Sequence, residues 1–131
     1  VLRNGVGMGD GDDVVVRAMA KQHIESPIIG FFIKDRLGQP LFGANTFLTY
    51  ELNPVSTDSG KILEARFNFD LPILLVGDYS ITAAIADGSL LSHQQLHWVH
   101  DAALFKVTGS TLDGVLVGIP MSGIQLKTFD Y

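Results

Sequence analysis

Apolar and polar residues alternate along most of this chain, and a period of two is typical of strands that bury one face. In Lys61–Asp70, the clearest case, the apolar residues share one parity: Leu63, Ala65, Phe67 and Phe69. A strand places residues of one parity on the same side of a sheet. The pattern therefore predicts a strand at Lys61–Asp70 with its apolar side in a core.

Other segments with this alternation are also predicted to be strands: Asp12–Lys21, Ile28–Asp35, Leu41–Tyr50, Asp78–Asp87, His93–Val99, Ala103–Thr108 and Gly114–Ile119. We expect Leu41–Tyr50 to be broken near Gly43–Asn45. Glycine and aspartate favour turns, so Asp35–Gly38 and Thr57–Gly60 are expected to connect strands.

Strand parity predicts which side chains of two of these strands are buried. In Asp12–Lys21 one face carries Val14, Val16, Ala18 and Ala20. In Asp78–Asp87 the inward residues are Tyr79, Ile81, Ala83 and Ile85, and the outward residues are Ser80, Thr82, Ala84 and Ala86.

About seven to nine short strands between glycine, aspartate and asparagine turns are typical of an all-β protein built as a two-sheet antiparallel sandwich, immunoglobulin-like or jelly-roll-like. No segment keeps a helical period for more than a turn or two. We therefore predict a single domain over residues 1–131. The glycine-rich residues 1–11 are expected to form a flexible lead-in. Residues 121–131 alternate Ile124, Leu126 and Thr128, which predicts one more strand.

Composition limits the classes of partner. The formal charge of −5 repels phosphate backbones and anionic lipid, so nucleic acid is not an expected partner. No stretch approaches the roughly 18 apolar residues that span a bilayer. The absence of cysteine favours a cytoplasmic location. Because the chain begins at Val1, we expect it to be part of a longer protein.

Catalytic motifs are missing from the sequence: it has no nucleophile elbow, phosphate-binding loop, dinucleotide-binding loop or zinc-protease helix. A glycoside hydrolase needs two carboxylates about 5–10 Å apart. Glu64 and Asp70, on one strand, lie roughly 20 Å apart. His93 and His97 lie about 13 Å apart on a strand, too far to share a metal ion. We therefore expect no enzyme activity, no cofactor and no metal site.

Outward positions of successive predicted strands carry groups that pair with sugar hydroxyls. If Leu96 and Trp98 face the core, Gln95 and His97 face outward. The candidate carbohydrate-binding residues with polar side chains are Arg66, Asn68, Ser80, Thr82, Gln95 and His97. Their guanidinium, amide, hydroxyl and imidazole groups supply donors and acceptors. Trp98 is a further candidate, whose ring either joins the core or stacks on a sugar. The alternative for the whole set is an ordinary solvated face.

Several phrases of the sequence together resemble one family. They are Ile29–Gly38 with Leu41–Thr46, Phe67-x-Phe69-x-Leu71 before Gly77-Asp78-Tyr79, and His97–Ala102 before Phe105-x-Val107. From about Asp12 to Pro120 the chain resembles the C-terminal domain of Wzt proteins, the nucleotide-binding components of bacterial ABC exporters for O-antigen polysaccharide.

This resemblance implies a β-sandwich that binds finished O-antigen polysaccharide in the cytoplasm, at the inner face of the inner membrane, and couples its recognition to export. It also implies a homodimer that exchanges residues 121–131, and a longer protein with an ATPase domain and membrane components as partners. The polymannose exporters are the relatives it suggests first, so polymannose is the expected glycan. The alternative function is an immunoglobulin-like interaction or assembly domain that binds no glycan.

Overall fold

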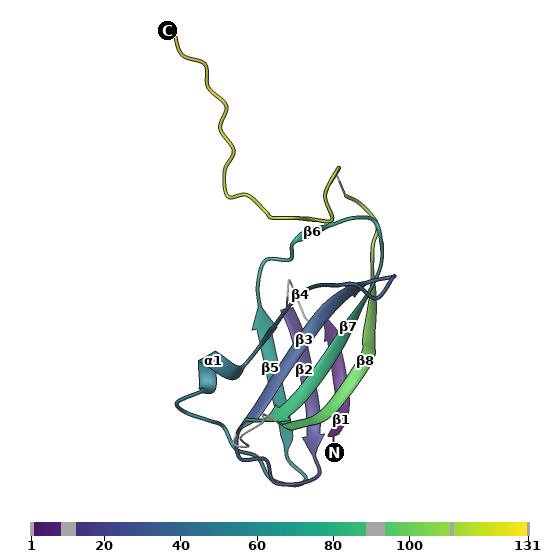
Figure 1. Ribbon diagram of the computed structural model, residues 1–131, viewed down its shortest axis with the longest axis vertical. Helices are drawn as coiled ribbons and strands as arrows, with labels where there is room; N and C mark the ends of the chain where they lie inside the picture. Colours follow the sequence, from purple (N-terminus) through teal and green to yellow (C-terminus); the bar gives the residue numbers. More distant parts are fainter. Residues whose placement is uncertain (1, 9–12, 89–93, 111, 131) are drawn as a thin grey trace.

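In the computed structural model, which describes residues 2–8, 13–88, 94–110 and 112–130, two antiparallel sheets face each other (Figure 1). The smaller sheet has the order β1 (Leu2–Met8), β2 (Asp13–Ala20) and β5 (Ile62–Asn68). The larger sheet has the order β4 (Pro40–Asn45), β3 (Pro27–Asp35), β7 (Gly77–Asp87) and β8 (Gln94–Val107). At one end β6 (Ile73–Leu74) pairs with β9 (Val117–Gly118). The predicted two-sheet antiparallel sandwich is confirmed.

The core lies between the inner faces of the two sheets. On β2 the buried residues are those that parity predicts: Val14, Val16, Ala18 and Ala20. Phe31 of β3 joins the sheets, because its ring centroid lies 4.8 Å from that of Phe67 and 5.9 Å from that of Phe69. The strict alternation in β2 and β5 thus becomes one continuous apolar layer.

The strand order follows the immunoglobulin-like arrangement, in which a three-stranded and a four-stranded sheet pack face to face. Tyr79, near the start of β7, donates its hydroxyl hydrogen to the carbonyl of Leu75 at 2.6 Å. A tyrosine in this position fixes the corner before the strand in many such domains. Burial raises the pKa of the Tyr79 hydroxyl, which keeps the proton on this donor.

The start of the chain differs from the prediction of a flexible lead-in at residues 1–11. Residues 2–8 form β1, whose register on β2 runs from Leu2 opposite Ala20 to Met8 opposite Val14. Without β1, the edge of β2 would have backbone N–H and C=O groups without hydrogen-bond partners. Glycine lacks a side chain but keeps both backbone groups, so the glycine-rich residues 2–8 can still pair with that edge. The prediction for residues 9–11 lies outside the described residues.

The segment Leu41–Tyr50 also differs from its prediction as a broken strand. β4 continues through Gly43–Asn45, and the helix α1 (Phe47–Tyr50) follows it. The helix closes with a hydrogen bond from the Tyr50 N–H to the Thr46 carbonyl at 3.2 Å. No helix in the described part of the chain is long and apolar enough to cross a membrane.

The last third of the chain contains one long strand and an extended tail. The predicted strands His93–Val99 and Ala103–Thr108 are parts of the single strand β8, which contains two register shifts. Residues 121–130, predicted as part of a further strand, form none within this chain and extend away from the sandwich (Figure 1). Their apolar side chains are exposed, with Leu126 at 98% and Phe129 at 83%.

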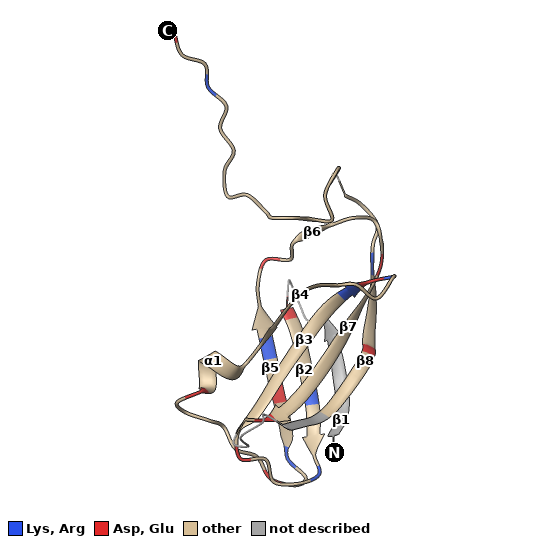
Figure 2. Ribbon diagram, in the orientation of Figure 1, with Lys and Arg blue, Asp and Glu red and all other residues tan. Residues whose placement is uncertain are grey.

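Charged side chains of both signs are interspersed over strands and turns (Figure 2). Several form opposite-charge pairs across strands or turns, such as Arg17 with Glu64 and Lys106 with Asp78. Among the described residues, this surface offers no extended basic track.

His23 links the β2–β3 connection to the segment before β5. Its Nδ1 lies 2.6 Å from Asp58 Oδ1, and its Nε2 lies 2.8 Å from Glu25 Oε2. Carboxylates only accept, so both ring nitrogens must carry protons to form both bonds. Hydrogen bonds to Glu25 and Asp58 accordingly raise the pKa of His23, while His23 lowers the pKa of Asp58. Backbone hydrogen bonds between Ile24 and Thr57 run beside this contact.

Stability is expected to decrease as pH rises through the titration of His23. When folding raises the pKa of a group, the stabilisation is complete at pH values below the pKa of that group in the unfolded chain, which is 6.5 for His23. The stabilisation is lost as pH rises through the higher pKa of the folded state. The stabilisation from the lowered pKa of Asp58 is constant above its ordinary value of 3.8 and is lost only as pH falls below it, outside this window. Melting temperatures measured from about pH 5 to about pH 9 should show a decrease in the wild type that His23→Gln lacks. Parallel profiles for the two proteins would contradict this role.

Candidate functional site

The outer face of the larger sheet is hollowed because its central strand carries small side chains there. On this face β7 places Ser80, Thr82, Ala84 and Ala86, and β3 places Gly30 opposite Ala84. Beyond Gly30, the neighbouring strands carry larger outward side chains, such as Phe32 of β3 and Trp98 of β8. The result is a shallow hollow of about 270 Å³ whose lining includes Gly30, Ala84, Ala86 and Asn45.

An aromatic row, made of Phe32 on β3 with Trp98 and His100 on β8, crosses this face. The Trp98 ring stacks against Phe32 with centroids 6.0 Å apart and planes 6° apart, and against His100 at 5.8 Å and 9°. Phe32 is 40% exposed and Trp98 42% exposed, so a ligand can reach both rings. Gly43 of β4 leaves room for the row, since a Cβ there would lie only 3.0 Å from Phe32 Cδ1 and 2.2 Å from the Phe31 carbonyl oxygen.

A one-residue shift in β8 decides which of its side chains join this face. Ala86 of β7 lies opposite Gln95, whereas the preceding Ile85 lies opposite His97. The extra residue reverses the parity of the strand beyond it. His97 therefore shares the side of buried Ile85, and Trp98 takes the outer side.

The predicted facing of β8 is therefore wrong at two candidate residues. His97 was expected to face outward but is half-buried on the core side, and Trp98, which was expected to face inward in that register, is exposed. Gln95 lies opposite Ala86, and its side chain is outside the described residues. The prediction assumed a regular strand, and without the extra residue in the pairing it assigned His97 and Trp98 to the opposite sides.

Ser80 and Thr82 do lie on the outer side of β7, yet both are buried, at 8% and 0% exposure. The prediction that their side chains are accessible to a ligand is therefore wrong. Phe32 lies opposite Thr82, and Leu104 lies opposite Ser80, so larger neighbours cover these short side chains. They form the floor of the face rather than its accessible surface.

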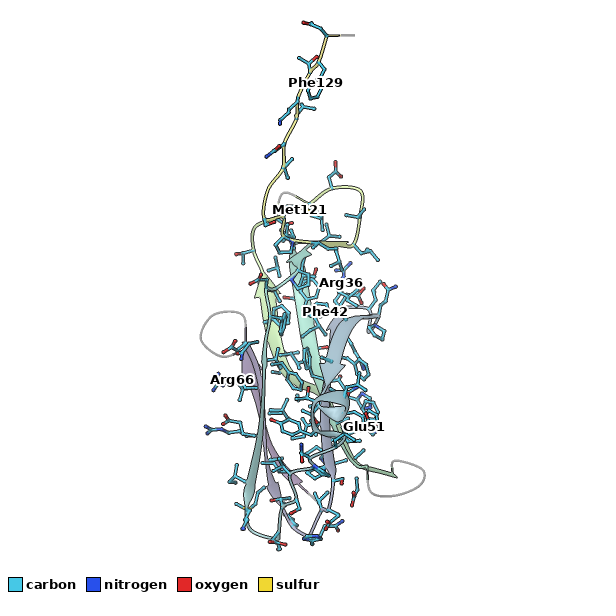
Figure 3. The ribbon with its side chains drawn as sticks, turned by 90° about the vertical axis from the view of Figure 1, so that its left-hand side faces the viewer. Arg36, Phe42, Glu51, Arg66, Met121 and Phe129 are labelled. Carbon is cyan, nitrogen blue, oxygen red and sulfur yellow. The ribbon has the colours of Figure 1, made fainter. Side chains whose placement is uncertain are left out.

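Arg66 lies on the far side of the sandwich, on the outer face of β5 in the smaller sheet (Figure 3). Asn68, two residues further along β5, has the same parity and lies on the same face. Arg66 Nη1 is 3.1 Å from Asp13 Oδ2, and the amide of Asn68, oriented to donate, also reaches Asp13. Arg66 Nη2 lies 3.9 Å from Glu64, whose pKa is held down chiefly by a hydrogen bond from Arg17. The structure therefore does not bring the predicted candidates together on one face.

Two members of the aromatic row were missed by sequence reasoning. Phe32 lies between the buried residues Phe31 and Ile33, so the parity of Ile28–Asp35 already places a phenylalanine on the outer side. His100 follows Trp98 by two residues, a spacing that shares a face once Trp98 is known to point outward. Only the outward facing of Trp98 lacked a sequence signal.

The face offers stacking and hydrogen bonding. Lys34 Nζ lies 3.4 Å from His100 Nδ1 at one end of the aromatic row, and the amide of Asn45 lines the hollow. Among the residues that the structure describes, no three His, Asp or Glu side chains gather as metal ligands. These groups suit a neutral ligand with apolar faces and hydroxyl edges.

The fold and this face define an immunoglobulin-like β-sandwich domain with an exposed aromatic surface. A family model described as the Wzt C-terminal domain matches residues 3–119, and the chain belongs to that family. A solved structure titled "Crystal structure of the C-terminal domain of wzt" is similar with a TM-score of 0.71 and 22% identity, over 87% of this chain and 69% of that one. No curated protein matches the chain.

Proposed function

We propose that this chain binds bacterial O-antigen polysaccharide on the outer face of the larger sheet and couples its recognition to export by an ABC transporter. The observation that carries the proposal is the exposed aromatic row beside a hollow floored by glycine and alanine. Membership of the Wzt C-terminal domain family supports it.

The chemistry of sugars fits this surface. The C–H groups on a sugar ring make an apolar patch that packs on the electron-rich face of an aromatic ring, as Trp98 and Phe32 provide. The hydroxyls on the sugar's edge can accept hydrogen bonds from the Asn45 amide nitrogen and the Lys34 ammonium, while the Asn45 Oδ1 already accepts the Phe47 N–H at 2.9 Å. The small floor residues leave space for a chain to lie along the sheet.

The transporter context follows from the family. We expect an ATPase domain elsewhere in the full-length protein, membrane components as partners, and a place in the cytoplasm at the inner face of the inner membrane. This domain would act by binding alone, without catalysis. Polymannose is the first glycan to test, with dissociation constants of about 1 mM to 1 μM expected for a shallow face. A neutral glycan should bind with little dependence on salt.

A homodimer is part of the proposal. Residues 121–130 expose Ile124, Leu126 and Phe129 in the single chain. Within the described part of the chain, β4 and β5 are edge strands that each pair with one neighbouring strand. A tail that adds to a partner's sheet would satisfy that edge and cover its own apolar side chains. Two-fold symmetry would make the same contact twice.

Replacing Trp98 with alanine is expected to weaken O-polysaccharide binding by about tenfold or more, because the largest ring of the face is lost. The melting temperature should stay close to that of the wild type, since Trp98 is 42% exposed. Isothermal titration with O-polysaccharides of defined structure measures the first quantity, and thermal unfolding the second. Trp98→Phe, which keeps a ring, should retain part of the affinity.

Arg66→Ala is the matched control, because Arg66 lies on the opposite face and should not affect binding. If Arg66→Ala lost binding while Trp98→Ala kept it, the binding site would lie on the smaller sheet instead. If the wild type binds no O-polysaccharide, the domain is instead an immunoglobulin-like interaction or assembly module.

A further inference from the structure

β8 bulges opposite Thr82, beside the aromatic row. Between the pairs Ala83–Val99 and Ile81–Ala103, Thr82 alone faces the β8 residues His100, Asp101 and Ala102. A bulge of this kind bends the strand and re-aims its side chains, and such bulges are frequent next to binding sites.

Asp101, at the centre of this bulge, has a left-handed backbone. Its φ is 52°, and it is the only residue other than glycine with a positive φ in the described part of the chain. Aspartate and asparagine tolerate this conformation better than most side chains. The Asp101 N–H donates to Thr82 Oγ1 at 3.4 Å, and Thr82 is fully buried. The buried hydroxyl thus holds the bulge in place.

Asp101 lines a second hollow, of about 210 Å³, together with Arg36, Ser80 and Leu104. The two hollows succeed each other along β7. The first lies over Ala84 and Ala86, the aromatic row crosses near Thr82, and the second lies over Ser80. A chain laid along β7 would therefore pass from one hollow across the row into the other.

Asp101 is the carboxylate at the second hollow that remains available. Asp35 accepts hydrogen bonds from the N–H groups of Leu37 and Gln39, both at 2.9 Å. Asp78 lies 3.7 Å from the ammonium of Lys106. Within the residues that the structure describes, the Asp101 carboxylate has no hydrogen-bond or ion-pair partner. An ionised carboxylate accepts two hydroxyl hydrogen bonds side by side, and such bonds are stronger than those between neutral groups.

We propose that Asp101 determines specificity at a second sugar subsite, where its carboxylate accepts hydrogen bonds from two adjacent hydroxyls of a neutral sugar unit. The neighbouring unit packs on the aromatic row. This inference rests on the proposed glycan binding and narrows the ligand to a neutral chain of which at least two consecutive units are bound. The left-handed backbone and the Thr82 hydroxyl position the carboxylate.

The test uses two variants that keep the left-handed backbone. Asp101→Asn removes the charge at constant shape, and Asp101→Gly removes the side chain. Both should bind neutral O-polysaccharide at least about tenfold more weakly than the wild type. Trp98 is the only tryptophan, so its fluorescence emission reports directly on the aromatic row. Its emission and the melting temperature should be unchanged in both variants. Asp70→Asn, with the same loss of charge beyond the end of β5, should bind like the wild type.

Each outcome is decisive. Wild-type affinity in both Asp101 variants, with binding lost in Trp98→Ala, overturns the second subsite and leaves the proposed function in place. Weakened binding together with a shifted Trp98 emission also overturns it, because Asp101 then acts through the fold. A wild type that binds none of the polysaccharides overturns the proposed function and this inference together. Oligosaccharides of about one to four units, cut from the bound polysaccharide, should show affinity that rises beyond the first unit.

Discussion

Replacing Phe31 with alanine is expected to lower the free energy of unfolding by about 3–5 kcal/mol. Phe31 is 2% exposed and packs against Phe67 of the opposite sheet and against Phe69, just beyond the end of β5. Its removal would leave a cavity at the point where the two sheets meet, in addition to the lost burial of the ring. Domains of this size have a total stability of about 5–15 kcal/mol, so the loss is a large part of it.

Phe32→Ala is the matched control, since it removes the same side chain from the next position of the same strand. Phe32 faces outward and is 40% exposed, so its loss should cost clearly less than that of Phe31. Urea unfolding of the two variants measures both values. Equal destabilisation by the two variants would contradict the structure, in which Phe31 faces the core and Phe32 faces outward.

The pattern of alternation predicted the strands that have no irregularities. β2 buries the residues that its parity assigns to the core, such as Val14. In β5 the assigned residue Ala65 is buried, while Leu63 and Phe67 are partly buried against the core. A regular strand keeps one parity from end to end, so the side of each residue follows from its position. The turn at Asp35–Gly38 is also as expected, with φ of 81° at Gly38. Local chemistry was sufficient for these elements.

The facing of β8 could not be predicted, because one extra residue in its pairing with β7 reverses the sides of all that follow. Whether that residue lies before or after His97 depends on contacts with Ile85 and Ala86 of another strand. The sequence of β8 itself contains no such information. Of the two alternatives for Trp98, a place in the core is therefore the one that the structure excludes.

The prediction that all the candidate residues share one face was wrong for a different reason. β5 and β7 are close in the chain, but the immunoglobulin-like order assigns them to different sheets, so the outward side chains of Arg66 and Ser80 point to opposite sides of the sandwich. Parity states which side of a strand a residue occupies, and only the topology states which sheet that side belongs to. Phe32 and His100 take the place of Arg66 and Asn68 beside Trp98.

Deleting residues 121–131 is expected to convert the proposed homodimer into a monomer. In the single chain Leu126 is 98% exposed and Ile124 is 85% exposed. Exposing these apolar side chains to water is unfavourable, and no surface in the described part of the lone domain covers them. Pairing the tail with a partner's sheet edge would bury these side chains and satisfy backbone groups on both chains, and the symmetric copy would double the gain. The core of the sandwich lies before the deletion, so the truncated domain should remain folded.

Light scattering at micromolar concentration measures the change of mass, and thermal unfolding checks the fold of the truncated chain. Leu126→Asp, which places a charge where burial is proposed, should dissociate the dimer without shortening the chain. Lys127→Ala, the adjacent position of opposite parity, should leave the dimer intact because its side chain would face away from the contact. A truncated chain that stays dimeric would exclude tail exchange, and dissociation by Lys127→Ala but not Leu126→Asp would reverse the facing of the tail.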